Sequence, residues 1–147
     1  MSQEQNLIPH AERLESGVVG EEARMIEVMI RSYCKKFHRT EDNELCKECS
    51  DLLYYAKKRL ACCPFQEKKS TCAHCTIHCY RNKERELIRD VMRTTGPSML
   101  LKHPVMTLNH FIRSLKTPPN KPRNIRKWRQ FRAKRPRTFY LNTIKLI

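Results

Sequence analysis

The sequence lacks the motifs that mark the common enzyme classes. It has only three glycines, and it contains no phosphate-binding glycine loop, no His-Glu-x-x-His motif and no nucleophile elbow. It also has no run of 18 or more apolar residues, which argues against a membrane-spanning helix. The first 20 residues contain no basic flank followed by an apolar block, so a secretory signal is not expected. We therefore predict a cytoplasmic protein that is not an enzyme.

Acidic residues are missing from the C-terminal part of the chain. Residues 1–90 contain all 15 Asp and Glu together with 16 Lys and Arg, whereas residues 91–147 contain 14 Lys and Arg and no acid. The net charge of +15 is therefore concentrated after residue 90.

The most basic segment, residues 117–147, is expected to be a disordered tail. Its charges suit the phosphate backbone of a nucleic acid, and its aromatic rings could stack on bases. The residues predicted to make this contact are Arg123, Arg126, Lys127, Trp128, Arg129, Arg132, Lys134 and Arg135. The same composition is compatible with a solvated tail or with association with anionic lipids.

The eight cysteines are confined to residues 34–79. Thiols do not persist as structural disulfides in a reducing cytosol, so a dense cluster there indicates metal binding or redox chemistry. In a secreted protein the same eight could form four disulfides, but no export signal favours that alternative.

Apolar residues recur at helical spacing in four segments. The first predicted helix covers residues 21–38, with Glu21 and Glu22 in its first turn and an inner stripe that ends at Phe37. Ser50 is a suitable N-cap for a second helix that ends near Ala61. The inner positions of these two helices are predicted to be Ile26, Met29, Ile30, Tyr33, Leu53, Ala56 and Leu60.

Two further helices are predicted after the last cysteine. One covers residues 83–93 and is expected to stop at Gly96-Pro97, and the other begins at Pro104. Their inner faces are predicted to carry Leu87, Ile88, Val91, Met92, Val105, Leu108, Ile112 and Leu115.

The pattern as a whole predicts an all-α protein, a small bundle of about four short helices with Cys/His metal-binding knuckles. Residues 1–20 are expected to be a flexible segment, residues 21–116 the helical metal-binding domain, and residues 117–147 the basic tail. A core of this size is marginal on apolar burial alone, so crosslinking by metal should contribute to folding.

The first candidate metal site is formed by Cys34, His38, Cys46 and Cys49. Residues at i and i+4 share a helical face, so Cys34 and His38 can converge on one ion. A Cys-x-x-Cys turn supplies two more thiolates, and three Cys with one His complete a tetrahedral structural zinc site. Alternatively, His38 only interacts with the end of its helix.

The second candidate site contains Cys63, Cys72, Cys75 and Cys79, which could hold zinc or an iron–sulfur cluster. Cys63 is preferred over Cys62 because Pro64 fixes the turn that follows it. His78 is the alternate ligand to Cys79. Zinc is the expected cofactor, with an iron–sulfur cluster as the alternative.

The chain resembles the nitrous oxide-stimulated promoter protein family, the YgbA type, over about residues 21–116. The residues that carry this resemblance are Met25-Ile26, Tyr33-Cys34, His38, Leu45-Cys46, Cys49, Tyr55-Ala56, Arg59-Leu60, Cys63-Pro64-Phe65, Lys68, Cys72, Cys75, His78-Cys79-Tyr80, Val91-Met92-Arg93, Gly96-Pro97 and His103-Pro104. The resemblance implies a small cytosolic bacterial protein associated with the response to nitric oxide. It implies no activity or substrate.

We therefore predict a metal-binding protein of the nitrosative stress response, whose cysteine centres are structural or sense nitrosative attack. Two alternatives stay open. One is a regulator that binds nucleic acid through the basic tail, and the other is a redox protein with an iron–sulfur cluster.

Overall fold

The described part of the chain is helical. The computed structural model describes residues 8–40, 44–77 and 79–116, and no strand occurs within them. Its elements are η2 (Ala11–Leu14), α1 (Gly17–His38), α2 (Lys47–Ala61), η3 (Gln66–Lys68), η4 (Cys72–His74), α3 (Asn82–Lys102) and α4 (Pro104–Ser114), in which η marks a short 3-10 helix. The predicted all-α class is confirmed, although α1 and α3 are longer than expected.

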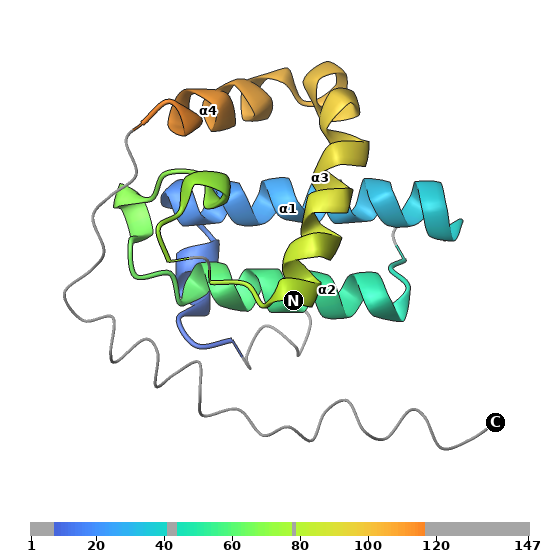
Figure 1. The fold of residues 1–147 in the computed structure, drawn as a ribbon, viewed down its shortest axis with the longest axis horizontal. Helices are drawn as coiled ribbons and strands as arrows, with labels where there is room; N and C mark the ends of the chain where they lie inside the picture. Colours follow the sequence, from blue (N-terminus) through green and yellow to red (C-terminus); the bar gives the residue numbers. More distant parts are fainter. Residues whose placement is uncertain (1–7, 41–43, 78, 117–147) are drawn as a thin grey trace.

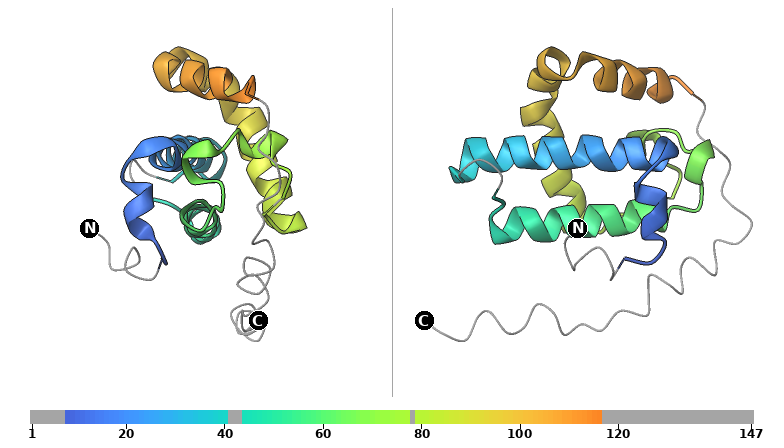
Figure 2. Two further views of the ribbon diagram at one scale, coloured as in Figure 1. Left: turned by 90° about the vertical axis from the view of Figure 1, so that its left-hand side faces the viewer. Right: turned by 180° about the vertical axis from the view of Figure 1, so that it is seen from behind.

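Two antiparallel helices form the base of the fold. Helices α1 and α2 lie side by side, and α3 crosses them (Figure 1). Viewed along the pair, α3 lies on one side of α1 and α2 while η2 lies on the other (Figure 2). Helix α4 returns over α1 from the far end of α3.

The apolar core lies where α1, α2 and α3 meet. Ile30, Ala56, Leu60 and Val91 from these three helices are almost completely buried. Burying a side chain such as Leu or Ile contributes roughly 1.5–3 kcal/mol, so this shared core accounts for the packing of the helices. Phe37 and Leu87, both predicted to face inward, are exposed instead.

Helix α1 begins at Gly17, four residues before the predicted start at Glu21. The backbone N–H of Val18 in its first turn donates a hydrogen bond to the Glu67 carboxylate at 3.0 Å. A carboxylate is favoured there by unpaired N–H groups and by the helix dipole, and it comes from η3, which is distant in sequence and which local sequence does not reveal. Residues 8–20, which sequence assigned to a flexible segment, thus contain η2, the start of α1 and the buried Ile8.

Helix α2 begins before the predicted N-cap, Ser50. Cys46 is the N-cap, and its carbonyl accepts a hydrogen bond from the N–H of Ser50 at 2.9 Å. The helix ends at Ala61 as predicted. The Cys-x-x-Cys element therefore lies in the first helical turn rather than in the preceding loop.

Helix α3 continues past Gly96-Pro97, where the sequence predicted a stop, and ends at Lys102. A proline normally clashes with the Cβ of the preceding residue in the α conformation, and Gly96 has no Cβ. The Thr95 and Ser98 hydroxyls on either side of the pair donate hydrogen bonds to the carbonyls of Val91 and Thr95, at 2.6 and 2.7 Å. Gly96 thus removes one steric obstacle to the proline, although Pro97 itself has no N–H to donate to the carbonyl of Arg93.

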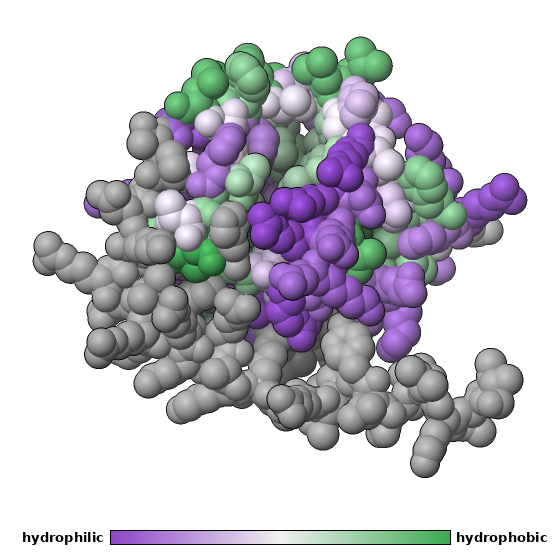
Figure 3. Space-filling view, in the orientation of Figure 1, coloured by the Kyte–Doolittle hydropathy of each residue, from purple (hydrophilic) through white to green (hydrophobic). Residues whose placement is uncertain are grey.

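Helix α4 starts with Pro104 at its first position, as predicted, but its apolar face points away from the core. Its predicted inner residues Val105, Leu108, Ile112 and Leu115 are each at least half exposed. Hydrophobic residues accordingly appear along the top of the molecule (Figure 3). The reason is that the opposite face carries Arg113, the residue of α4 that is buried, against acidic residues of α1.

Across the described residues, no helix has the length and apolar content needed to cross a membrane.

Candidate metal centre

The first candidate site lies where α1 gives way to α2. Cys34 and His38 lie on the last turns of α1, and Cys46 and Cys49 lie at the start of α2. Arg39 ends α1 in the left-handed backbone conformation, with φ of 52°, which turns the chain back toward α2. Because α1 and α2 are antiparallel neighbours, the two pairs of side chains meet at one end of the helix pair.

The donor atoms of Cys34, His38, Cys46 and Cys49 all lie within 4.8 Å of one another. Nδ1 of His38 is 3.0 Å from Sγ of Cys46 and 3.4 Å from Sγ of Cys49. A tetrahedral zinc ion with zinc–sulfur bonds of about 2.3 Å places its sulfur ligands about 3.8 Å apart. The observed spacing is compatible with one ion, so the predicted convergence of this group is confirmed.

Local hydrogen bonds favour the thiolate form of Cys34. Its Sγ accepts hydrogen bonds from the Thr40 hydroxyl and from the backbone N–H of Cys46, both at 3.3 Å. Burial raises the pKa of Cys34, but these hydrogen bonds outweigh burial and lower the pKa below its usual range. Burial together with the neighbouring thiols raises the pKa of Cys49. The pKa values of Cys34 and Cys49 are thus shifted in opposite directions within one site. A bound cation would favour the thiolate form of all three cysteines.

The second predicted group is arranged differently. Cys72, Cys75 and Cys79 line a cavity of about 160 Å³ next to α3, and Cys63 is buried nearby. Among the described residues, the group around Cys34 is the one set of three or more Cys, His, Asp or Glu whose donor atoms gather closely. The second group is therefore more widely spaced than the first.

Other predicted site residues lie apart from these groups or outside the described residues. Sγ of Cys62 lies 3.9 Å from the carbonyl oxygen of Pro9, while Cys63 is buried, and this burial raises the pKa of its thiol. His74 is exposed and pairs with Thr71 at 3.1 Å. His78 and all eight predicted nucleic-acid contacts, from Arg123 to Arg135, lie outside the described residues, so those assignments stay predictions.

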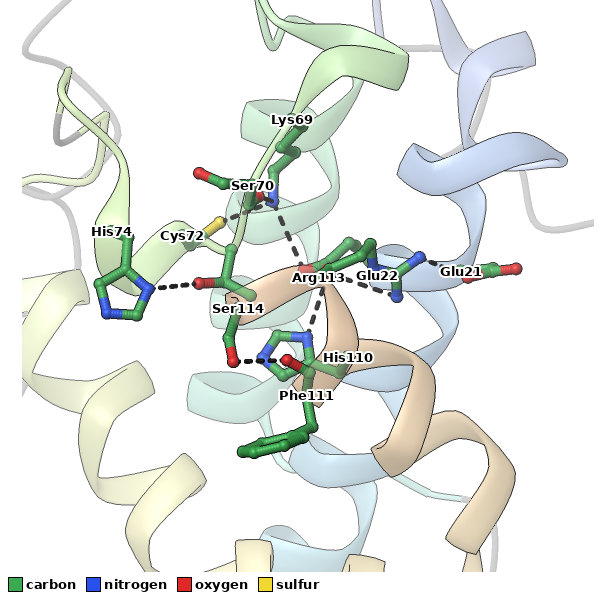
Figure 4. Close-up of polar contacts among 11 residues, drawn as sticks. Glu21, Glu22, Lys69, Ser70, Cys72, His74, His110, Phe111, Arg113 and Ser114 are labelled. Carbon is green, nitrogen blue, oxygen red and sulfur yellow. Dashed lines mark hydrogen bonds and ion pairs between the residues drawn. The ribbon is translucent and has the colours of Figure 1, made fainter. Parts of the chain in front are cut away.

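A buried charge network that the sequence did not reveal lies beside the second group (Figure 4). Nζ of Lys69 is 3.1 Å from Sγ of Cys72 and 3.4 Å from the carboxylate of Glu22. The other side of that carboxylate is 3.1 Å from Nδ1 of His110 and 3.6 Å from the guanidinium of Arg113. The network therefore joins the cysteine loop to α1 and α4.

Glu22 was predicted to stabilise the first turn of a helix. In the structure it is instead the carboxylate that Lys69, His110 and Arg113 share. Burial raises the pKa of Glu22, but the hydrogen bond with His110 and the charges of Lys69, His110 and Arg113 outweigh burial and lower it from 4.5 to about 2. No sequence signal marks this site, because Lys69 and His110 are 47 and 88 residues away from Glu22.

The lowered pKa of Glu22 predicts a loss of stability in acid. The ionised carboxylate stabilises the fold above pH 4.5, and this contribution is lost as the pH falls from 4.5 toward 2. Over this pH range we expect the free energy of unfolding of the wild type to fall by about 3 kcal/mol more than that of Glu22→Gln. Urea unfolding of both proteins at several pH values measures the difference. Protonation of the ligands of the candidate metal centre affects both proteins equally, so it produces no difference between them. Parallel pH profiles would therefore contradict the prediction.

Comparison with known proteins agrees with the sequence resemblance. A family model described as nitrous oxide-stimulated promoter matches residues 17–123. The uncharacterized protein YgbA of Escherichia coli (strain K12) is 41% identical over 75 residues, which cover 51% of this chain and 64% of that protein. The chain thus spans less than two thirds of the length of this relative. No solved structure matches the chain.

The range matched by the family model contains the four α-helices and all eight cysteines. This coverage, together with the identity to YgbA, decides the family. The chain belongs to the nitrous oxide-stimulated promoter family.

Proposed function

We propose that the protein is a non-catalytic zinc protein of the bacterial response to nitric oxide, in which Cys34, His38, Cys46 and Cys49 hold the ion. The observation that carries this proposal is the gathering of these four donors within 4.8 Å. The nitric oxide setting is supported by the description of the family to which the chain belongs.

The donor set favours a structural role for the ion over a catalytic one. Three sulfurs and one imidazole fill a tetrahedral zinc site, whereas catalytic zinc sites keep a position open for water or substrate. Zinc bound there would supply charge that keeps the three thiols deprotonated and would crosslink α1 to α2. Cys34 and Cys49 are buried at the junction of these helices, so the crosslink would act directly on the core.

The same site is accessible to a small reagent. His38 is exposed and Cys46 is partly exposed, although the other two donors are buried. Thiolates are the nucleophilic and oxidisable form of cysteine, and S-nitrosylation is one of their reversible modifications. In this proposal, attack on Cys46 would weaken the site and loosen the hairpin of α1 and α2.

Metal analysis of the full chain tests the proposal. We expect protein purified without oxygen to contain zinc at one ion per chain in the first group, and Cys46→Ser to lose that ion. Cys62→Ser is the matched control, because Sγ of Cys62 faces the carbonyl of Pro9 rather than this group. A nitric oxide donor should release zinc from the wild-type chain and alter its circular dichroism.

Two results would count against the proposal. Equal zinc content in the wild type and Cys46→Ser would show that the first group is not the zinc site. Unchanged zinc content and circular dichroism after exposure to the donor would remove the link to nitric oxide.

A further inference from the structure

A second set of thiols converges on one cavity next to α3. The cavity has a volume of about 160 Å³ and is lined by Cys72, Cys75 and Cys79 together with apolar side chains of α1 and α3 and the basic residues Arg85 and Arg89 of α3. Cys63 is 8% exposed and belongs to the same segment, although it does not itself line the cavity. Three cysteines of one irregular segment thus line a common space, and Cys63 of the same segment is a buried fourth thiol.

The spacing of these thiols distinguishes them from the first group. A single zinc ion requires its sulfur ligands about 3.8 Å apart. The first group approaches this spacing, but Cys63, Cys72, Cys75 and Cys79 are not gathered in this way. Four cysteines hold an iron–sulfur cluster further apart, because several iron and sulfide atoms lie between them.

The size of the cavity matches this wider arrangement. A cavity of about 150 Å³ is large enough to hold benzene, a molecule of six heavy atoms. The cavity between the thiols, about 160 Å³, is therefore much larger than one metal ion needs. Ile26, Ile88 and Met92 form the apolar part of its wall, whereas the partly exposed Arg85 and the exposed Arg89 line its solvent side.

Buried cations next to the thiols complement the charge of a cluster. Four thiolates around a doubly positive iron–sulfur core leave two negative charges. Lys69, 6% exposed, has its Nζ at 3.1 Å from Sγ of Cys72, and the equally buried Arg59 acts electrostatically on Cys79. Burying positive charge is costly without a negative partner, and Glu22 is the carboxylate that pairs with Lys69.

Two buried polar groups near the cavity also lack partners within the described residues. They are the Nε–H of Arg59 and the hydroxyl of Tyr80, and Tyr80 lines the cavity. Buried donors are nearly always hydrogen-bonded, so an orphaned donor calls for an explanation. Hydrogen bonds to sulfur atoms are one of the means by which proteins tune iron–sulfur clusters.

We propose that Cys63, Cys72, Cys75 and Cys79 hold an iron–sulfur cluster in this cavity, separate from the zinc site at the junction of α1 and α2. The protein then carries two chemically different centres. One is a compact single-ion site at one end of the α1 and α2 pair, and the other is a cluster site on the segment between α2 and α3. The second assignment does not depend on which metal the first group binds.

Anaerobic reconstitution of the full chain with ferric iron, sulfide and a thiol reductant tests the proposal. We expect iron and acid-labile sulfide to be incorporated together, with visible absorption. Cys72→Ser combined with Cys75→Ser should lose both, whereas Cys46→Ser should keep them and lose zinc. Cys62→Ser should keep both metals, which makes it a control for a thiol adjacent to a proposed ligand.

Alkylation of the wild-type chain provides a readout that does not depend on whether a variant folds. In the reconstituted protein Cys72, Cys75 and Cys79 should be protected from alkylation, and removal of the cluster should expose them. Three results would overturn the proposal. They are the absence of sulfide from the reconstituted wild type, retention of the cluster by the double variant, and a second zinc ion bound by these thiols.

Discussion

Glu22→Gln should destabilise the protein by about 3–5 kcal/mol, the range for breaking one partner out of a buried ion pair. The side chains of Glu22 and Lys69 are 4% and 5% exposed, so water cannot replace the lost carboxylate charge. Arg113, whose side chain is 9% exposed, would lose the same partner. Urea unfolding followed by circular dichroism at neutral pH measures the change in the free energy of unfolding.

Glu21→Gln is the matched control for this prediction. Glu21 is adjacent in sequence and pairs with the same Arg113, but its side chain is 42% exposed. An exposed ion pair contributes about 0–1 kcal/mol, so the control should be nearly silent. If the free energy of unfolding falls by the same small amount in both variants, burial does not determine how much these ion pairs contribute to stability. Glu22→Leu combined with Lys69→Met should recover part of the loss, because no buried charge remains on this pair.

Removing metal from the first group should lower the thermal midpoint strongly. Structural zinc binds with an apparent free energy of roughly 10–16 kcal/mol, which is as large as the total stability of a typical domain. A loss of only 3 kcal/mol would lower the midpoint of a domain of this size by roughly 12–24 °C. Thermal unfolding by circular dichroism, with and without a strong chelator, measures the effect.

Cys46→Ser and Cys62→Ser separate the role of the first group from that of thiols in general. Cys46→Ser should already melt at the lowered midpoint, and chelator should lower it little further. Cys62→Ser should behave as the wild type in both conditions, because its thiol lies outside the group. A wild-type chain that keeps its midpoint after measured removal of zinc would refute the structural role of the ion.

The network around Glu22 explains how a helix with an exposed apolar face is held in place. Helix α4 contributes Arg113 and His110 to the carboxylates of α1, whereas Val105, Leu108 and Ile112 point outward. Charge and hydrogen bonding therefore attach α4 to the body, together with Met106, which packs against the core. For this reason the loss of Glu22 should affect α4 first, before it affects the core of α1, α2 and α3.

The sequence was sufficient for features that depend on short-range geometry. Cys34 and His38 share a helical face because they are four residues apart, and Cys46 and Cys49 share a helical turn because they are three apart. Apolar spacing likewise identified Leu53, Ala56 and Leu60 as buried positions of α2, and Pro104 marked the first residue of α4. The all-α class and the first donor group followed from these local rules.

Tertiary structure decided what depends on distant partners. Glu67 of η3 accepts a hydrogen bond from Val18, 49 residues away, in the first turn of α1. Lys69 and His110 pair with Glu22 from other elements. The spacing of apolar residues correctly showed that α4 has an apolar face. It could not show whether this face packs against the core or points to solvent, and the structure has it exposed. The spacing of Cys63, Cys72, Cys75 and Cys79 was also beyond the sequence, because an irregular segment has no fixed rise or period from which distances follow.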